Sequence, residues 1–214
     1  MANVYHEVKT PIAIIQNYAT ALQSEAITIE QRKEYSDAII TASRKLSSLV
    51  TNILKLSKLE NQEIMPVSEP FDLCRQLAEC ALSFEEAMER KSIDLSVDMD
   101  DKLVISADEN MLEIVWNNLF SNALKFTEPG GTITLKQTSD EYSVTLSILD
   151  SGCGISKETL KHIFDKFYQG DTSHSQDGNG LALALKVIEL ADGSITAKSE
   201  VGVGSTFTVR LKTE

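Results

Sequence analysis

Apolar residues recur at alternating spacings of four and three along two N-terminal segments of the chain. The first set is Val4, Val8, Pro11, Ile15, Tyr18 and Leu22, and the second is Tyr35, Ile39, Ala42, Leu46, Leu49, Ile53 and Leu56. This spacing keeps the apolar side chains on one face of a helix, so it predicts two amphipathic helices, the second running to about Glu60. The polar break at Ser24–Thr28 is short, and we therefore expect an antiparallel helical hairpin.

An isolated two-helix hairpin leaves half of its apolar surface exposed. We expect a second copy of the chain to cover that surface, which gives a homodimeric four-helix bundle. The alternative is that the hairpin packs onto the rest of the same chain. Pro11 interrupts the hydrogen bonding of the first helix, so we expect a bend there.

The pattern changes after Asn61–Pro70, which contains two prolines and few periodic apolar residues and is typical of a linker. We expect helices at Phe71–Lys91, at Asp108–Lys125, from Ser156, and at Leu181–Leu190. We expect strands at Ile93–Val97, Leu103–Ser106, Thr132–Gln137, Tyr142–Leu149, Ser194–Ser199 and Thr206–Leu211. This mixture predicts an α+β sandwich with helices on one face of a mixed sheet. The expected division is a hairpin at 1–62, a linker at 63–70 and a second domain at 71–214, which is long enough to fold alone.

Composition narrows the classes of function. A net charge of −12 disfavours nucleic acid and anionic membrane surfaces as partners. The apolar runs are too short to span a membrane, and no signal peptide is recognisable. The three cysteines are too few and too irregularly spaced for a disulfide framework or a zinc site. These features favour a reducing, cytoplasmic environment.

His6 is the first candidate for chemistry. It lies two residues from Val4 and from Val8, about 200° around the helix from each, and is therefore expected to face water. Near pH 7 a neutral imidazole has one ring nitrogen free to attack an electrophile, and Glu7 is a suitable acceptor for the proton on the other. A surface histidine beside a glutamate is usually only a polar surface, so this motif needs support from the rest of the chain.

Three groups of residues in the second domain offer that support. Asn118, Asn122 and Lys125 are four and three residues apart and form one polar stripe on a helix, suited to a hard cation and to phosphate oxygens. Asp150–Ile155 follows a strand directly, and its two glycines allow close approach of a flat ligand while Asp150 accepts a hydrogen bond. Asp165–Gly180 is polar and aperiodic and ends just before a helix, which fits either a lid over phosphates or an ordinary surface loop.

In this order the motifs resemble those of the sensor histidine kinases of two-component signalling. They are H-E-V-K-T-P at 6–11, N-N-L-F-S-N-A-L-K-F at 117–126, D-S-G-C-G-I at 150–155, I-F-D-K-F-Y at 163–168, G-N-G-L-A-L at 178–183 and G-V-G-S-T-F at 202–207. Each motif alone is weak to moderate evidence, but the whole series at these separations is specific.

The resemblance implies a dimerisation and phosphoacceptor bundle followed by a Bergerat ATP-binding sandwich, with ATP and Mg²⁺ as cofactors. It implies that His6 is phosphorylated, that Glu7 orients and deprotonates it, and that Thr10 positions a water for regulator dephosphorylation. It assigns magnesium and phosphate contacts to Asn118 and Asn122 and phosphate contacts to Lys125. The further residues that it places around the nucleotide or the lid are Asp150, Gly152, Gly154, Ile155, Phe164, Phe167, Tyr168, Gly178, Gly180 and Leu181. The implied partner is a response-regulator receiver domain that docks over Ala13, Ile14 and Asn17.

Three positions depart from the family pattern. Ala182 replaces a glycine, and its methyl group is expected to crowd the nucleotide or stiffen the lid. Tyr5 replaces a small residue before the histidine. Gln169 replaces an arginine, for which Lys166 is a candidate substitute. These departures favour, as the alternative, an impaired or engineered core that retains regulator binding and phosphatase activity. Another ATPase with the same fold, related to gyrase, mismatch-repair or chaperone ATPases, is disfavoured by the His6 motif.

The start of the chain close to His6 leads us to expect a cytoplasmic fragment of a membrane-anchored receptor.

Overall fold

The computed structural model describes residues 2–24, 26–61, 63, 65–166, 168 and 180–213. Phe167, Gln169 and Gly178, which the sequence analysis singled out, lie outside the described residues, as does the side chain of His6.

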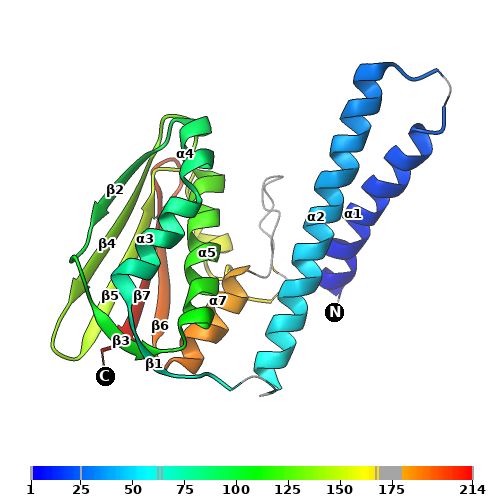
Figure 1. Ribbon diagram of the computed structural model, residues 1–214. Coiled ribbons are helices and arrows are strands. Elements are labelled where there is room, and N and C mark those ends of the chain that lie inside the picture. The colour runs from blue at the N-terminus through cyan, green and yellow to red at the C-terminus, as the bar shows by residue number, and fades with distance from the viewer. Residues whose placement is uncertain are drawn as a thin grey trace.

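The N-terminal part is the expected helical hairpin (Figure 1). Helix α1 spans Ala2–Ala21 and runs through Pro11, and helix α2 spans Ile29–Glu60. Helix α2 begins at a capping box, in which the Gln31 amide donates to Thr28 Oγ1 (3.1 Å) and the Thr28 amide donates to Gln31 Oε1 (3.0 Å). The rings of Tyr18 and Tyr35, both predicted on the apolar face, lie 5.0 Å apart between the two helices.

The last turns of α2 pack onto the second domain. Leu56 and Leu59 are each 3% exposed and belong to the same buried cluster as that domain's core. Lys166 of the second domain pairs with Glu60 at the end of α2. The alternative that the hairpin packs onto the rest of its own chain therefore holds for this end of the helix.

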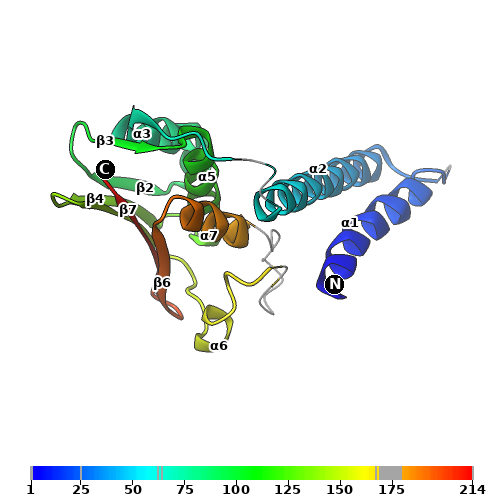
Figure 2. The ribbon, with the colours of Figure 1, turned by 90° about the horizontal axis from the view of Figure 1, so that it is seen from below.

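The second domain has helices on one face of a mixed sheet, as predicted (Figures 1 and 2). The strands are β1 (Glu69–Asp72), β2 (Asp94–Asp98), β3 (Val104–Ala107), β4 (Thr132–Ser139), β5 (Ser143–Asp150), β6 (Ser194–Glu200) and β7 (Gly204–Lys212). The helices are α3 (Leu73–Ser83), α4 (Glu85–Lys91), α5 (Glu109–Phe126), α6 (Lys157–Leu160) and α7 (Gly180–Leu190). The five-stranded sheet has the order β2-β4-β5-β7-β6, in which β2 is parallel to β4 and the other pairs are antiparallel, and β1 pairs with β3 separately.

Alternation along the strands buries one face of the sheet under α3, α5 and α7. In β5 the inward residues Val144, Leu146 and Ile148 are buried and the residues between them are half-exposed. Trp116 of α5 is fully buried in this core, and its Nε1 donates to Gln76 Oε1 at 2.8 Å. Because the indole N–H has this partner, the largest core side chain is buried without an unsatisfied donor.

The single helix predicted at Phe71–Lys91 is wrong at its start and in its middle. Phe71 and Asp72 belong to strand β1, and helix α3 begins after Asp72, whose Oδ1 accepts from the amides of Arg75 (3.4 Å) and Leu103 (3.3 Å). The helix then breaks at Phe84, whose ring stacks on Phe120 at 6.0 Å. Both deviations arise from contacts with residues distant in sequence, which the local pattern does not contain.

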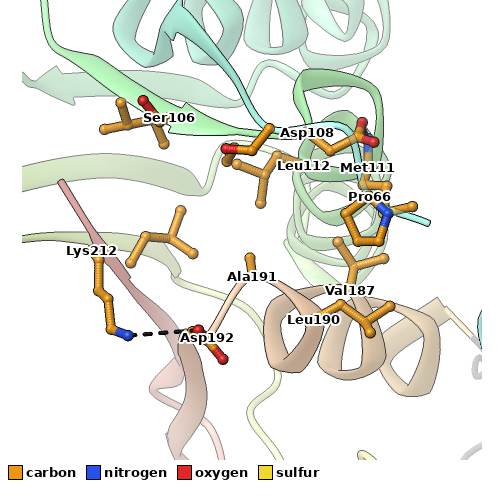
Figure 3. Close-up of a pocket in the computed structure, with 14 residues that line it drawn as sticks. Pro66, Ser106, Asp108, Met111, Leu112, Val187, Leu190, Ala191, Asp192 and Lys212 are labelled. Carbon is orange, nitrogen blue, oxygen red and sulfur yellow. Dashed lines mark hydrogen bonds and ion pairs between the residues drawn. The ribbon is translucent and has the colours of Figure 1, made fainter. Parts of the chain in front are cut away.

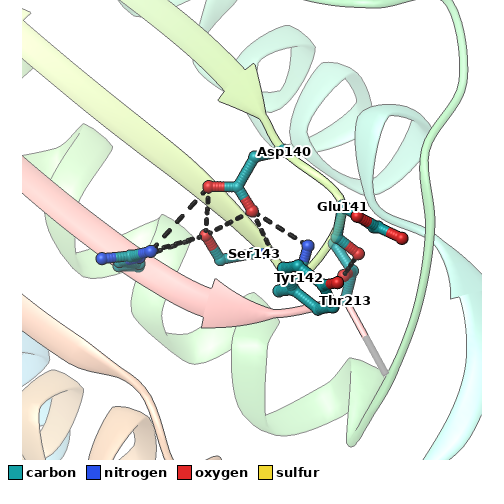
Figure 4. A network of polar contacts seen from close by, with 6 residues as sticks. Asp140, Glu141, Tyr142, Ser143 and Thr213 are labelled. Carbon is teal, nitrogen blue, oxygen red and sulfur yellow. Dashed lines mark hydrogen bonds and ion pairs between the residues drawn. The ribbon is translucent and has the colours of Figure 1, made fainter.

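A polar network fixes the turn between β4 and β5 (Figure 4). Asp140 Oδ1 accepts from the amides of Tyr142 (2.9 Å) and Ser143 (2.8 Å), and these bonds, with the Ser143 hydroxyl, lower the pKa of Asp140. Arg210 of β7 donates from Nε and Nη2 to Ser143 Oγ at 3.1 and 3.0 Å. The network joins β7 to this turn and helps to hold the register of β4, β5 and β7. That register determines which residues are neighbours at the opposite end of these strands.

Candidate active site

The predicted polar stripe occupies one side of α5. This helix is capped by Asp108, whose Oδ1 accepts from the Met111 amide at 3.0 Å, and its other side carries the fully buried core residues. Asn118, Asn122 and Lys125 are all half-buried. The sequence thus places one amphipathic helix between the core and a polar site.

Asn118 lies directly against the first residue of α7. Its Nδ2 donates to the carbonyl of Ile114 at 2.7 Å, which fixes the orientation of the amide. A β-carbon at Gly180 would overlap Asn118 Oδ1, so any larger residue at this position would force the Asn118 side chain to move. The structure therefore brings together the asparagine motif and the second glycine motif, which are about sixty residues apart. The amide oxygen and the helix N-terminus are groups that suit a hard cation and phosphate.

Asp150 ends strand β5 and is buried, with 9% of its surface exposed. Burial raises the pKa of its carboxyl group, and hydrogen bonds from the amide of Gly152 (3.0 Å), from the amide of Ser205 and from the Ser205 side chain lower it in part. A buried carboxylate at the end of a strand is positioned to accept a further hydrogen bond from a ligand amino group.

The glycines beside Asp150 allow close approach of the chain's own backbone. A β-carbon at Gly152 would overlap the carbonyl oxygen of Phe126, and one at Gly154 would overlap the carbonyl oxygen of Glu200. Gly154 also has φ +70°, a conformation that disfavours other residues. The space that these glycines leave is therefore occupied by the chain's own backbone, which closes the loop tightly against α5 and β6.

Sequence reasoning included Ser205 only within the motif at 202–207, without a role, and missed Ser199. Both serines continue the row of Asp150 across the sheet. Asp150 is paired with Ser205 of β7, and Ser205 is paired with Ser199 of β6. Their Oγ atoms lie 3.0 Å apart. The available signal is a polar residue at an inward position of each strand, but assembling the row requires the strand register.

The other predicted residues lie in three different settings. Ile155, Phe164 and Leu181 are half-buried and pack against the core. Tyr168 is half-buried, with its ring 5.2 Å from that of His162. Lys166, the candidate substitute for Gln169, pairs with Glu60.

The phosphoacceptor motif lies on α1, in the other part of the molecule from Asn118 and Asp150. Glu7 is buried, with 8% of its surface exposed, so the carboxylate beside His6 is not a solvated surface group. Thr10 is exposed. Of the predicted docking residues, Ile14 and Asn17 are exposed and Ala13 is half-buried.

A cavity of about 280 Å³ lies away from these residues (Figure 3). It is lined by the first turns of α5, including Met111 and Leu112, and by the last turns of α7, including Val187 and Leu190. Lys212 and Asp192 form an ion pair at its edge, 3.6 Å apart. Since Asn122 and Lys125 lie near the end of α5 and Gly180 begins α7, this cavity, at the opposite ends of the two helices, is separate from the predicted nucleotide site.

Within the part of the chain that the structure describes, none of the helices combines the length and apolar character needed to cross a membrane.

Known proteins match both parts of the chain. Residues 107–214 match the family described as Histidine kinase-, DNA gyrase B-, and HSP90-like ATPase. Residues 1–62 match the His Kinase A (phospho-acceptor) domain. The sensor protein SrrB of Staphylococcus aureus strain N315 is 29% identical over 222 residues, a match that covers 99% of this chain but 37% of SrrB. This chain therefore spans well under half the length of that relative.

Two solved structures are similar to this chain over all or nearly all of its length. Histidine kinase ThkA in complex with response regulator protein TrrA is 24% identical with a TM-score of 0.83, and the match covers 100% of this chain and 60% of that one. Full-length ShkA in complex with AMPPNP is 26% identical with a TM-score of 0.73, and the match covers 98% of this chain and 44% of that one.

Proposed function

The chain belongs to the sensor histidine kinases, with a His Kinase A domain joined to a histidine kinase-, DNA gyrase B- and HSP90-like ATPase domain, and from this we propose that it phosphorylates itself on His6. The phosphoryl donor is ATP, and the next acceptor is an aspartate of a response regulator. The observation that carries the proposal is the contact of Asn118 with the start of α7, in the same domain as the buried Asp150.

The nucleotide end of the site is assigned as follows. Asp150 accepts a hydrogen bond from the adenine amino group, and Lys125 and the N-terminus of α7 contact the phosphates. The amide oxygens of Asn118 and Asn122 would hold magnesium, which neutralises phosphate charge when bound. The orientation of the Asn118 amide, fixed by its bond to Ile114, supports this assignment. The complex of ShkA with AMPPNP supports ATP as the nucleotide.

The transfer itself is an in-line displacement at the γ-phosphorus. One ring nitrogen of His6 forms the new N–P bond while the bond to the β,γ-bridging oxygen breaks, and ADP leaves. Glu7 takes the proton from the other ring nitrogen. Burial of Glu7 supports this role, because a buried carboxylate is held in place more firmly than a solvated surface group.

The partners of the hairpin are a response regulator and a second copy of the chain. The complex of ThkA with TrrA supports the regulator, which we place over Ile14 and Asn17. A second apolar stripe on α2 supports the homodimer, since Ile40, Val50 and Leu54 are 46%, 44% and 55% exposed. We assign residues 1–62 to dimerisation and phosphotransfer and 71–214 to ATP binding, with 63–70 between them. We also propose that Thr10 supports regulator dephosphorylation, and that the chain is the cytoplasmic part of a membrane-anchored sensor.

The test is incorporation of labelled γ-phosphate from Mg-ATP into the purified chain. We expect acid-labile, base-stable label in the parent, none in His6→Ala, and unchanged labelling in the control Arg90→Met, which changes an exposed residue outside the proposed site. Label that persists in His6→Ala would contradict the assignment of the acceptor.

Absence of label from a folded parent that still removes phosphate from a regulator would favour the impaired core. ATP hydrolysis that is unaffected by His6→Ala and yields no phosphoprotein would instead favour another ATPase of this fold.

A further inference from the structure

Asp150, Ser205 and Ser199 form a polar row at one end of the sheet. They are register partners on the adjacent strands β5, β7 and β6. All three occupy inward positions, and the inward positions further along these strands are apolar, such as Ile148 and Phe207. The alternation of inward and outward residues places apolar side chains in the core along most of these strands. At this end it places two hydroxyl groups beside the Asp150 carboxylate.

Ser199 connects three segments of the candidate base pocket. Its Oγ accepts from the amide of Ile155 at 2.7 Å, donates to the carbonyl of Gly204 at 2.8 Å and lies 3.0 Å from Ser205 Oγ. Ile155 ends the glycine-containing loop that follows Asp150, and Gly204 begins β7. One hydroxyl therefore joins this loop to the strand that carries Ser205.

The hydroxyl protons can be assigned along this row. A serine hydroxyl donates one hydrogen bond and can accept two. Ser205 bonds to Asp150 through its side chain, so its proton is directed to the carboxylate, and the single proton of Ser199 is shared between the Gly204 carbonyl and the Ser205 oxygen. Ser199 thereby links the Ile155 amide and the Gly204 carbonyl to the Ser205 hydroxyl that bonds to Asp150.

We propose that Ser199 is a positioning residue for nucleotide recognition. This inference rests on the proposed function, in which Asp150 accepts from the adenine amino group. Ser199 holds the Ile155 amide and Ser205 in place, and Ser205 in turn fixes the orientation of the Asp150 carboxylate. Without the hydroxyl, the half-buried Ile155 amide loses its acceptor, the loop shifts, and the carboxylate is no longer aligned with a base.

A comparable hydroxyl pair on the same sheet provides a matched control. Ser147 Oγ lies 3.1 Å from Thr208 Oγ1, and these residues are also register partners on β5 and β7. They lie three register positions from the row of Asp150. Ser147→Ala therefore removes a serine hydroxyl pair from the sheet without touching the candidate pocket.

The experiment compares the parent, Ser199→Ala, Ser199→Thr and Ser147→Ala. Each is titrated with ATP and with inosine triphosphate, whose base carries a carbonyl in place of the adenine amino group, and is assayed for autophosphorylation. We expect the parent to prefer ATP. Ser199→Ala should bind ATP about tenfold more weakly, the scale of one buried hydrogen bond, with a smaller loss for inosine triphosphate. The KM for ATP should rise while kcat at saturation stays unchanged, Ser199→Thr should restore affinity, and Ser147→Ala should match the parent.

Two results would overturn the inference in different ways. A parent that binds both nucleotides equally would refute the role of Asp150 and thereby remove the basis for Ser199. A parent that prefers ATP, with Ser199→Ala retaining that preference at full strength, would leave the proposed function intact and show that Ser199 has no positioning role. Urea unfolding of each variant confirms that the comparison is made on folded protein.

Discussion

Lys91 caps the C-terminus of α5, the helix that carries the asparagine motif. It is the last residue of α4, and its ammonium donates to the carbonyls of Leu124 (2.8 Å), Lys125 (3.2 Å) and Thr127 (3.0 Å) at the end of α5. These carbonyls lack intrahelical partners, and the C-terminus of a helix carries partial negative charge. We predict that Lys91→Met, which keeps the aliphatic part of the side chain, destabilises the second domain.

The size of the effect follows from the contacts. A hydrogen bond with a charged partner contributes about 1.5–3 kcal/mol, and a cation at a partly buried helix C-terminus up to about 2 kcal/mol. The three bonds share one ammonium, and Lys91 is half-exposed, so water replaces part of them. We therefore expect a loss of about 2 kcal/mol in the free energy of unfolding, which lowers the urea midpoint by about 1 M at a typical m-value.

The single tryptophan provides the readout, because Trp116 is fully buried in the domain core. Urea unfolding followed by its fluorescence reports on this domain. Arg90→Met is the matched control: it removes a neighbouring cation whose only described ion pair, with Glu86, is exposed, and should cost less than about 0.5 kcal/mol. Equal midpoints for the two variants would refute the capping argument.

Four further predictions test the site. The raised pKa of Asp150 gives the folded chain stability at pH below its ordinary value of 3.8, and this stability is lost as pH rises through the raised pKa. The urea midpoint of the parent relative to Asp150→Asn should therefore fall as pH rises above about 4. A thiol reagent should modify the exposed Cys153 and spare Cys80, whose pKa burial raises to about 12, and ATP should slow the reaction. Ala182→Gly should bind ATP more tightly but cost about 1 kcal/mol of stability, and equal affinities in a titration would refute the first part. Tyr5, 64% exposed, should slow autophosphorylation, so Tyr5→Ser should be faster.

The elements predicted well from the sequence are those whose signals are local. The hairpin follows from its heptad spacing and the polar break, and α5 follows from its apolar periodicity. Strand β1 was missed because Pro70 argues against a strand and because its pairing partner β3 lies more than thirty residues away. Asp72, an N-cap residue, was the available signal for the true start of α3.

The residues of the candidate site likewise divide into those with a local sequence signal and those that depend on the fold. The motifs at Asn118 and Asp150 were found because each combines distinctive residue types at short spacing. The contact of Asn118 with Gly180, and the Ser199 hydroxyl, depend on which elements become neighbours after folding. The glycines at 152 and 154 were found, but the chain's own backbone fills the space they open. Sequence spacing identifies a glycine requirement without identifying what approaches it.

The polar row of Asp150, Ser205 and Ser199 occupies inward positions of the sheet that are filled by apolar core residues elsewhere along the same strands. Apolar side chains at these inward positions would extend the core, whereas a buried carboxylate carries a desolvation cost, seen as the raised pKa of Asp150. The surrounding structure reduces that cost through donors from Gly152 and Ser205 and holds those donors through Ser199 and the close-packed loop. A chain selected for stability alone would favour neutral groups here. The arrangement is consistent with a carboxylate kept oriented, partly satisfied, and able to accept one more hydrogen bond from a ligand.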